Sequence, residues 1–398
     1  MLHGKTVVLG VTGSVAAYKT ANLASMLVKQ HAAVHVIMTK NATHFINPIA
    51  FESLTATRCL VDTFDRNFQF HVGHVSIAKQ ADIVMIAPAS ANVIGKIASG
   101  IADDMLTTTV MACKAPILVS PAMNTNMYEN PVLQENLWKL RDYGMEVIEP
   151  ATGMLACRDV GAGKMPEPEV LLQYILKTIA CKKDLSGKRV LVTAGATQEA
   201  IDPVRYITNH STGKMGYAVA KAAMLRGADV TLISTPTAIE TPPFVKTVPV
   251  VSAEDMYRAA EAEIEKHDIL IMAAAVADFR PKQYTDHKIK KEDRNTHLEL
   301  ERTVDILSAL AEKKKENQYF CGFSMETEHM VENSKAKLVR KNLDLIAANS
   351  LRTEGAGFAV DTNVLTLITK EEIKELPLLS KEEAAHELLD YILEQEQS

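Results

Sequence analysis

The chain has 398 residues, 47% of them apolar, and this length exceeds what one ordinary hydrophobic core serves, so two domains are expected. Lys and Arg number 43 against 49 Asp and Glu, and the formal net charge of −6 argues against a nucleic-acid-binding protein. No apolar run approaches the length of a membrane span, and the first residues lack the regions of a signal peptide, so a cytoplasmic protein is expected. The five cysteines have no paired spacing, which argues against a disulfide framework and a zinc site.

The first half of the sequence alternates short apolar segments with helical patterns. Strands are predicted over residues 7–11, 33–38, 83–87, 117–120 and 146–148. Helical patterns between them include residues 16–29 and 131–143. This alternation predicts a parallel sheet covered on both faces, with ligands at the carboxyl ends of its strands.

The pattern breaks over residues 150–168, which read as a long loop containing several glycines and prolines. Loops of this length in a compact domain are usually functional or disordered. A helix is predicted over residues 170–179, and a charged linker follows at 182–188. We therefore expect one domain at 1–181 and a second at 189–398.

The second half repeats the alternation. Strands are predicted over residues 189–193, 229–233, 269–273, 319–323, 345–348 and 364–368. Helices are predicted over residues 217–226, 253–266, 305–315, 326–341 and 381–394. Residues 280–302 are polar, with a basic middle, and read as an arm or a lid. Each half is thus expected to be a doubly wound α/β domain.

Both halves open with an apolar strand, a turn of small residues and a helix. The first turn is Thr12-Gly13-Ser14, and in the second half Gly213 and Gly216 begin the helix. The unpaired N–H groups of a helix N-terminus after such a turn can bind phosphate. The repetition suggests two phosphate-bearing ligands and two reactions.

Further polar residues stand near the ends of the first-half strands. Ser90 and Asn92 follow one strand, and Asn124 follows another. His74 precedes a strand, and Cys157 lies in the long loop at 150–168. Taken singly, His74 reads as a surface or capping histidine and Asn124 as a turn asparagine, whereas a core position for Cys157 is disfavoured by its glycine and charged neighbours.

These segments together resemble the homo-oligomeric FMN-dependent cysteine decarboxylases. The matching pieces are the His74 segment, Thr12-Gly-Ser-Val-Ala-Ala-Tyr-Lys19, Ala87-Pro-Ala-Ser-Ala-Asn92, Pro121-Ala-Met-Asn124, Leu155-Ala-Cys157 and Gly161-Ala-Gly-Lys-Met165. The resemblance implies a flavodoxin-like fold. It also implies that FMN is bound by Gly13, Ser14, Thr39, Ser90, Asn92 and Met105.

The resemblance also explains why a decarboxylase would use a flavin. Loss of CO2 from an N-acyl cysteine needs an electron sink, and oxidation of its CH2–SH group to a thioaldehyde supplies one. His74 would be the base that aids this oxidation, since imidazole suits proton transfer near neutral pH. Asn124 would hold the substrate carboxylate, and Cys157, on a flap, would protonate the resulting enethiolate. Arg158 stands where the family often has glycine and Lys164 where it has arginine, which would alter the flap rather than the chemistry.

The second half resembles the phosphopantothenate–cysteine ligase domain, a Rossmann-like fold. The matching pieces are Val192-Thr-Ala-Gly-Ala-Thr-Gln-Glu199, Ile201-Asp-Pro-Val-Arg205, Asn209-His-Ser-Thr-Gly-Lys-Met-Gly216, Ala273-Ala-Ala-Val-Ala-Asp278, Lys288-Ile-Lys-Lys291, Gly322-Phe323 and Lys337-Leu-Val-Arg-Lys-Asn-Leu-Asp344. Ala196, Ala200 and Val304 are mild departures from the family pattern. Nearly the whole chain therefore resembles the bacterial bifunctional decarboxylase/ligase family of coenzyme A synthesis.

In that family CTP activates the carboxylate of 4′-phosphopantothenate as an acyl-cytidylate, and the amine of cysteine displaces CMP. Triphosphate chemistry needs positive charge and usually Mg2+. The resemblance implies catalytic roles for Asn209 and Lys288, although Asn209 also reads as a cap of the helix near Gly213. It implies CTP contacts from Ala273, Ala274, Ala275, Asp278, Lys288, Val304, Asp305, Ile306, Leu307, Phe323, Lys337 and Lys341.

Three other functions stay open at this stage. An NAD(P)-dependent dehydrogenase is disfavoured because the second half lacks the Gly-x-Gly-x-x-Gly fingerprint. A flavin-binding regulatory subunit, or a flavin decarboxylase of another cysteine-containing substrate, would explain the first half only. The resemblance further implies a homo-oligomer that combines trimeric decarboxylase contacts with ligase dimers, as in a dodecamer. The sequence does not identify which residues would bind Mg2+.

Overall fold

The computed structural model describes residues 1–64, 73–154, 160–290, 297–326, 329–350 and 360–396. The chain divides into two compact units, Met1–Cys181 and Lys182–Ser398. None of the described helices is long and apolar enough to cross a membrane.

The first unit is built on a five-stranded parallel sheet of order β2-β1-β3-β4-β5. Its strands are β1 (Thr6–Val11), β2 (Ala33–Met38), β3 (Ile83–Ala89), β4 (Ile117–Pro121) and β5 (Glu146–Val147). This is the flavodoxin-like strand order, so the fold predicted for the first half is confirmed. The sheet reverses direction of winding between β1 and β3, where such folds bind their ligands.

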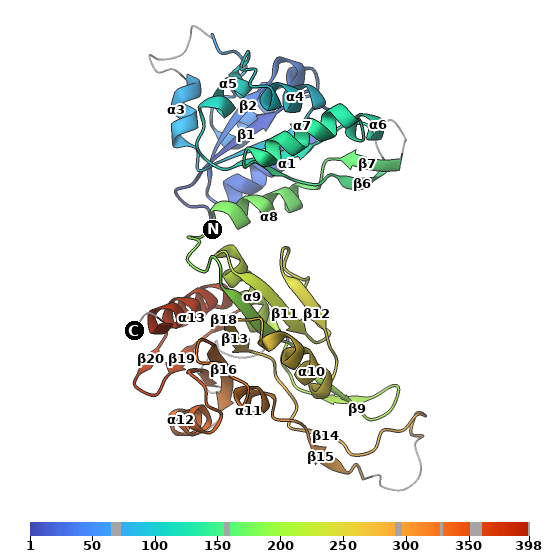
Figure 1. Cartoon of the computed structure of the whole chain (residues 1–398), viewed down its shortest axis with the longest axis vertical. Coiled ribbons are helices and arrows are strands. Elements are labelled where there is room, and N and C mark those ends of the chain that lie inside the picture. The colour runs from blue at the N-terminus through green and yellow to red at the C-terminus, as the bar shows by residue number, and fades with distance from the viewer. Residues whose placement is uncertain (65–72, 155–159, 291–296, 327–328, 351–359, 397–398) are drawn as a thin grey trace. The chain divides into compact units, whose positions relative to one another are not determined.

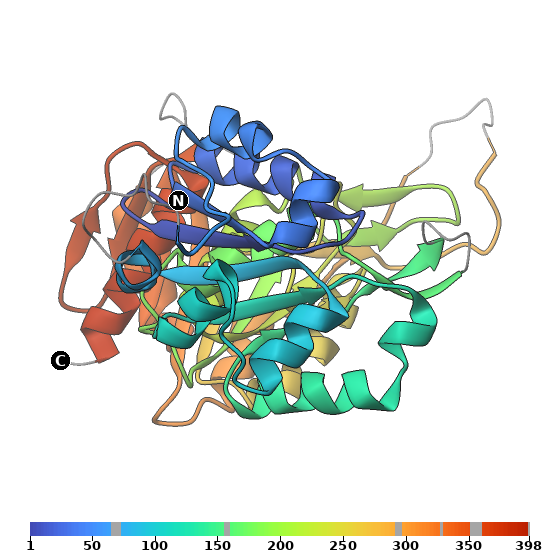
Figure 2. The same ribbon diagram turned by 90° about the horizontal axis from the view of Figure 1, so that it is seen from above.

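Helices cover both faces of this sheet, as Figure 2 shows by the blue helices on one side and the teal helices on the other. α1 (Ala17–Lys29), α2 (Pro48–Thr55) and α8 (Pro168–Ile179) pack together on one face. On the other face the core joins Val84 and Ile86 of β3 to apolar residues of four helices. These are α3 (Gly73–Gln80), α4 (Ala91–Ala98), α5 (Met105–Ala112) and α7 (Pro131–Asp142).

The sequence did not predict several short elements of this unit. α2, α3, α4 and α5 have eight residues each, and two turns are too few for the helical period to repeat. A 3-10 helix (Lys40–His44) and α6 (Thr125–Tyr128) were also not predicted. The expected loop at 150–168 contains an antiparallel pair, β6 (Ala151–Met154) and β7 (Val160–Lys164).

The second unit holds an eight-stranded sheet of order β12-β11-β8-β13-β16-β17-β19-β20. The first six strands are parallel: β8 (Arg189–Ala194), β11 (Asp229–Ser234), β12 (Lys246–Pro249), β13 (Ile269–Met272), β16 (Tyr319–Glu326) and β17 (Leu345–Ser350). β19 (Leu365–Ile368) and β20 (Ile373–Glu375) extend the sheet as antiparallel strands. Counted along the chain, the parallel strands follow the Rossmann order 3-2-1-4-5-6, as predicted.

Two helices, α9 (Lys214–Leu225) and α13 (Lys381–Glu396), pack against each other on one face of this sheet. The opposite face is covered by α10 (Ala253–Ile264), α11 (Ile306–Ala311) and α12 (Met330–Arg340), which share one apolar core. The helix predicted at 326–341 begins only at Met330 because β16 continues to Glu326. α11 likewise ends at Ala311 rather than at residue 315.

The polar segment at 280–302 is anchored by an antiparallel pair, β14 (Phe279–Pro281) and β15 (Leu300–Arg302), which extends away from the sheet of its unit (Figure 1). We refer to residues 279–302 as the arm. Two smaller pairs are β9 (Gln198–Ala200) with β10 (Tyr206–Thr208), and β18 (Thr362–Asn363) with β21 (Leu379–Ser380).

The segment at 182–188, expected as a linker, packs within the second unit. Leu185 is fully buried there, and its N–H donates to the carbonyl oxygen of Arg226 at 3.1 Å. The guanidinium of Arg226 binds both carboxylate oxygens of Asp184, at 2.8 and 2.9 Å. The polar residues of this segment therefore make specific tertiary contacts, which its composition did not predict.

Candidate active sites

A buried threonine joins the carboxyl ends of β1 and β3 in the first unit. Thr12 Oγ1 donates to the carbonyl oxygen of Pro88 at 2.7 Å and accepts the N–H of Ser90 at 2.8 Å. The turn at Gly13 is therefore held beside the start of α4. A Cβ on Gly13 would stand 2.8 Å from the Cβ of Asn41, so this turn accepts only glycine without rearrangement.

Two helix N-termini lie at this edge of the sheet. α1 has no side-chain cap, although Ser14 Oγ accepts the N–H of Ala16 at 3.4 Å. α4 begins after Ser90, whose side chain makes no capping bond, and Asn92 is exposed in its first turn. Uncapped N–H groups and hydroxyls in this arrangement suit a phosphate ligand.

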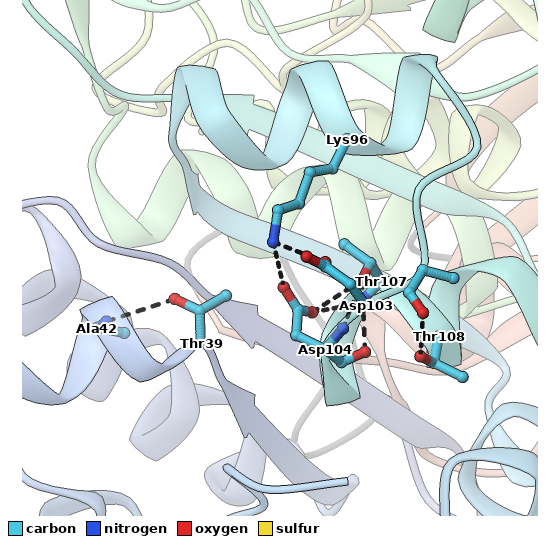
Figure 3. Close-up of polar contacts among 8 residues, drawn as sticks. Thr39, Ala42, Lys96, Asp103, Asp104, Thr107 and Thr108 are labelled. Atoms are coloured by element: carbon cyan, nitrogen blue, oxygen red, sulfur yellow. Dashed lines mark hydrogen bonds and ion pairs between the residues drawn. The ribbon is translucent and has the colours of Figure 1, made fainter.

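Two further predicted flavin contacts are Thr39, which precedes the 3-10 helix after β2 (Figure 3), and Met105, the first residue of α5. Thr39 Oγ1 accepts the N–H of Ala42 at 3.3 Å and so caps the 3-10 helix after β2. Met105 is buried at the start of α5, behind the capping residue Asp104. Burial acts to raise the pKa of Asp104, but N–H and hydroxyl donation from Thr107 and the charge of Lys96, 3.1 Å away, hold it below its usual value.

The three predicted decarboxylase catalytic residues lie on separate elements. His74 is the second residue of α3 and is half-buried. Asn124 Oδ1 accepts the N–H of Asn126 at 2.8 Å and caps α6 after β4. Cys157 lies outside the described residues. The pair β6–β7 that flanks it in sequence is anchored next to Asn124, because Met123 N–H donates to the carbonyl oxygen of Gly163 at 3.0 Å.

In the second unit a cavity of about 690 Å³ lies at the carboxyl edge of the sheet. Its lining combines the turn between β10 and α9, the loop after β13, the end of β16, and residues of α11 and α12. The predicted site residues in this lining are Asn209, Ala273, Ala274, Ala275, Asp278, Val304, Asp305, Ile306, Leu307, Phe323, Lys337 and Lys341. Segments separated by more than a hundred residues thus meet at one site.

Asn209 is fixed to the loop that follows β13. Its Nδ2 donates to the carbonyl oxygen of Ala275 at 3.1 Å, and Ala275 N–H donates to the carbonyl oxygen of Gly195 at 2.8 Å. The alternative reading of Asn209 as a helix cap is wrong, since α9 is capped by Gly213 without a side-chain bond. The amide of Asn209 is instead attached to the cavity wall.

Lys337 and Lys341, both predicted to contact CTP, line the same cavity. Lys341 Nζ lies 2.9 Å from Asp305 Oδ1, and Lys337 Nζ lies 3.4 Å from Ser324 Oγ. Burial acts to raise the pKa of Asp305, but the bond and charge of Lys341 outweigh it and hold this pKa below its usual value. The carboxylate of Asp305 also accepts the N–H of Ser308, so it orients Lys341 from a fixed helix start.

Lys288 is the one predicted ligase residue outside this lining. It is exposed on the arm. The backbone N–H and carbonyl oxygen of its neighbour Ile289 both form hydrogen bonds. Ile289 N–H donates to Asp202 Oδ2 at 3.2 Å, and its carbonyl oxygen accepts from Arg205 Nη2 at 3.0 Å. The arm beside Lys288 is therefore attached to the loop between β9 and β10.

The sequence reasoning missed several polar residues of the cavity: Lys214, Arg302, Thr303, Asn349, Asn363 and Lys381. Lys214 lies inside a quoted motif and could have been included. Lys381 begins the last helix, and nothing in a helical pattern marks its first lysine as a site residue. No group of three His, Cys, Asp or Glu side chains suited to a metal ion occurs among the described residues.

Comparison with known proteins gives the same division of the chain. Residues 1–180 match a family model described as Flavoprotein, and residues 185–395 match one described as DNA/pantothenate metabolism flavoprotein C-terminal domain. The coenzyme A biosynthesis bifunctional protein CoaBC of Bacillus subtilis is 47% identical over 396 residues, which cover 98% of this chain and 97% of that protein. This chain belongs to the CoaBC family.

Other members are similarly close. The CoaBC proteins of Vibrio cholerae and Escherichia coli are 44% and 40% identical, over 99% and 98% of this chain and 99% and 97% of their own lengths. A crystal structure of the C-terminal domain of a CoaBC protein covers 53% of this chain and 98% of that chain, with 47% identity and a TM-score of 0.46.

Membership of this family confirms the resemblance drawn from the motifs. The chain is a bifunctional enzyme of coenzyme A biosynthesis, with phosphopantothenoylcysteine decarboxylase and phosphopantothenate–cysteine ligase activities. Its first unit is a flavoprotein domain. The dehydrogenase alternative is wrong.

Proposed function

We propose that the two units catalyse consecutive reactions. The second unit joins cysteine to 4′-phosphopantothenate through an acyl-cytidylate made from CTP, and the first unit uses FMN to decarboxylate the product to 4′-phosphopantetheine. The observation that carries the ligase part is the single cavity that gathers twelve of the thirteen residues predicted for this reaction.

In the ligase reaction, we assign Phe323 and Asp278 to the base and sugar of CTP. Lys337 and Lys341 provide positive charge to its phosphates, and Lys288 adds to it from the arm. The amide of Asn209 donates to the oxyanion that develops at the activated carbonyl. Its attachment to the loop at Ala275 supports this role, because an oxyanion donor has to be fixed before the reaction begins.

We propose that Mg2+ is bound mainly by the phosphates of the nucleotide. Mg2+ usually binds one or two carboxylates together with substrate phosphates and water. Asp278 and Asp305, which line the cavity, are the carboxylates available there among the described lining residues. The lack of a three-ligand group in the described residues is compatible with such a site.

For the first unit, the FMN phosphate fits the edge formed by Gly13, Ser14 and Ser90. Gly13 leaves no room for a side chain, and the uncapped N-termini of α1 and α4 offer N–H donors. Asn92, Thr39 and Met105 complete the proposed contacts. Bound FMN would oxidise the substrate thiol and later return the hydride.

The protein residues then orient the substrate and move protons. His74 takes the thiol proton, Asn124 holds the carboxylate that leaves as CO2, and Cys157 protonates the enethiolate. The contact between Met123 and Gly163 supports this assignment, because it fixes the strand pair flanking Cys157 beside Asn124. Replacement of Cys157 by serine should leave CO2 release intact and block formation of 4′-phosphopantetheine.

We further propose a cytoplasmic homo-oligomer in which decarboxylase units form trimers and ligase units form dimers, twelve copies in all. Mass photometry of the purified chain tests this proposal. A single species of one or two copies at working concentration would contradict it.

One reaction tests both activities. The purified chain, after its visible spectrum has been recorded, is given 4′-phosphopantothenate, cysteine, CTP and Mg2+, and the products are followed by mass spectrometry. A flavin spectrum, CMP and 4′-phosphopantetheine are expected. Flavin without CMP would refute the CTP-dependent ligation, and CMP without CO2 release would leave the first unit as a flavin-binding regulatory domain.

A further inference from the structure

Lys19 is the one charged residue that is buried among the described residues of the first unit. It lies in the first turn of α1, close to the turn proposed for the FMN phosphate, and the assignments above give it no role. A buried ammonium group is costly unless an opposite charge or hydrogen-bond acceptors compensate for the lost water. The partners of Lys19 therefore indicate what this residue does.

Lys19 connects α1 with the segment that joins β7 to α8. Its Nζ donates to Glu167 Oε1 at 2.7 Å, and Glu167 is the residue that precedes α8. The same carboxylate oxygen lies 3.4 Å from Nζ of Lys164, the last residue of β7. The hydrogen bond from Lys19 is the main cause that lowers the pKa of the Glu167 carboxyl below its usual value. One ionised carboxylate thus binds both lysines and holds the end of β7 next to α1.

β7 in turn lies against the loop that carries Asn124. The carbonyl oxygen of Gly163 accepts the N–H of Met123 at 3.0 Å. A Cβ on Gly163 would collide with the carbonyl oxygen of Met123, and a Cβ on Gly161 would collide with Oγ1 of Thr125. The two glycines therefore let β7 pack closely on both neighbours of Asn124, so a displacement of β7 would displace this loop as well.

The contact between β7 and Thr125 is one of packing alone. Oγ1 of Thr125 is buried there and has no hydrogen-bond partner in the described part of the chain. Polar contacts that fix the position of β7 are made instead by Met123, through the carbonyl oxygen of Gly163, and by Lys19, through Glu167. These two contacts lie at the same end of β7, beside Asn124.

We propose that Lys19 and Glu167 are positioning residues for Asn124 in the decarboxylation. Lys19 fixes Glu167, Glu167 and Lys164 fix the end of β7, and β7 fixes the loop of Asn124. This inference rests on the role proposed above for Asn124, which is to hold the substrate carboxylate. Because α1 follows the turn proposed for the FMN phosphate, the ion pair also sets the position of that carboxylate relative to the flavin.

A phosphate group, of the flavin or of the substrate, is the alternative partner for Lys19. The contact with Glu167 favours the positioning role, because a carboxylate at 2.7 Å already neutralises this ammonium group. The two roles differ in what they predict. A lysine that binds a phosphate affects every ligand that carries this phosphate, whereas a residue that positions Asn124 affects only ligands that carry the carboxylate.

The test uses the full-length flavin-loaded enzyme with Lys19→Gln, Glu167→Gln and both replacements together. Lys5→Gln is the matched control, since Lys5 pairs with Asp82 at 3.2 Å before the first residues of β1 and β3, at the opposite edge of the same sheet. Flavin content, kcat/KM for decarboxylation of 4′-phospho-N-pantothenoyl-cysteine and the Ki of 4′-phosphopantetheine are measured for each variant. This product keeps the phosphate of the substrate and lacks its carboxylate.

Both single variants should lower kcat/KM about tenfold, with flavin content and the Ki of 4′-phosphopantetheine within about twofold of wild type. The double variant should be no worse than the single ones, because all three break the same contact. Lys5→Gln should behave as wild type in every measurement. Loss of flavin, an equally weakened Ki, additive losses in the double variant or an unchanged kcat/KM would each overturn the inference.

Asn124→Asp tells a failure of this inference from a failure of the proposed function. Aspartate keeps the oxygen that caps α6 but places a negative charge beside the substrate carboxylate, so kcat/KM should fall about a hundredfold. Normal decarboxylation by Asn124→Asp would refute the proposed role of Asn124 itself. An impaired Asn124→Asp beside normal Lys19 and Glu167 variants would refute only the positioning role. Should Lys19→Gln not fold, Glu167→Gln decides, because 54% of its side chain is exposed.

Discussion

Arg226 holds together three segments of the ligase unit, and its replacement by methionine should weaken this unit selectively. Its guanidinium is almost completely buried and binds Asp184 through two bonds, the carbonyl oxygen of His386 at 3.2 Å and Asp390 at 2.7 Å. Methionine keeps most of the aliphatic packing but leaves the two carboxylates without a partner. Loss of one partner of a buried ion pair costs about 3–5 kcal/mol. Because both carboxylates retain contact with water, we expect about 2–3 kcal/mol.

Hydrogen–deuterium exchange in the full chain, resolved by peptide, measures this loss. Peptides of the slowest-exchanging strands of the second unit should exchange about 30- to 150-fold faster in Arg226→Met, and those of the first unit should not change. Replacing Asp184 by asparagine in the same chain should recover part of the loss, since it removes one of the unpaired charges. Equal exchange of wild type and Arg226→Met in the second unit would refute the reasoning.

The same variant has a distinct pH dependence. Burial acts to raise the pKa of Asp184, but its bonds to Arg226 outweigh this and hold the pKa below its usual value. A carboxyl whose pKa is lowered by folding stabilises the protein above its unfolded pKa, about 3.9, and this contribution is lost as pH falls through the folded value. The difference between wild type and Arg226→Met should therefore be full near pH 6 and shrink below about pH 4.

Three further replacements test the sites. Gly163→Ala places a Cβ 2.4 Å from the carbonyl oxygen of Met123 at a φ of +124°, so decarboxylation should fall at least about tenfold with ligation unchanged. Lys341→Gln should raise the KM for CTP about tenfold and leave decarboxylation of added 4′-phospho-N-pantothenoyl-cysteine unaffected, and an unchanged KM would contradict its assignment. Asn209→Asp should slow amide formation by about two orders of magnitude, because it places negative charge where an oxyanion develops, and normal ligation would refute that role.

Much of both folds could be predicted from periodicity because the parallel strands are buried on both faces and read as apolar runs. β8, β11, β13 and β17 were placed within two residues of their ends for this reason. The edge strand β12 and several short helices were missed: β12 is half-exposed, and eight-residue helices such as α4 carry too little periodic signal. Hydrophobic periodicity reports how an element is buried, so elements that are short or half-exposed give little signal.

The site residues were predicted from family motifs, so cavity residues that lie outside these motifs were missed. Phe323 and Lys341, some twenty residues apart, meet in one cavity because a parallel sheet brings the carboxyl ends of its strands to one edge. Lys381 and Asn349 belong to the same cavity but lie in no quoted motif. Both side chains are buried, and Oδ1 of Asn349 has no hydrogen-bond partner; these are properties of three-dimensional packing.

Lys288 belongs to a family motif, but unlike the other predicted ligase residues it does not line the cavity. It is exposed and lies outside the cavity lining, so we expect the proposed contact with the nucleotide to form only when an arm moves to the cavity. Lys341 already faces the ligand space. Binding of CTP alone should therefore depend on Lys341 and hardly on Lys288, whereas turnover should depend on both.

Lys288→Gln is accordingly expected to leave the Kd of CTP within about threefold of wild type and to lower the kcat of ligation by about a hundredfold. Asp202→Asn, which weakens the bond to the N–H of Ile289 without touching the cavity, should lower kcat in the same direction but less strongly. Its decarboxylase activity serves as the internal control. A Lys288→Gln variant that loses CTP affinity as strongly as Lys341→Gln would show that the arm already contacts the nucleotide in the resting enzyme. A Lys288→Gln variant with unchanged kcat would remove Lys288 from the catalytic site altogether.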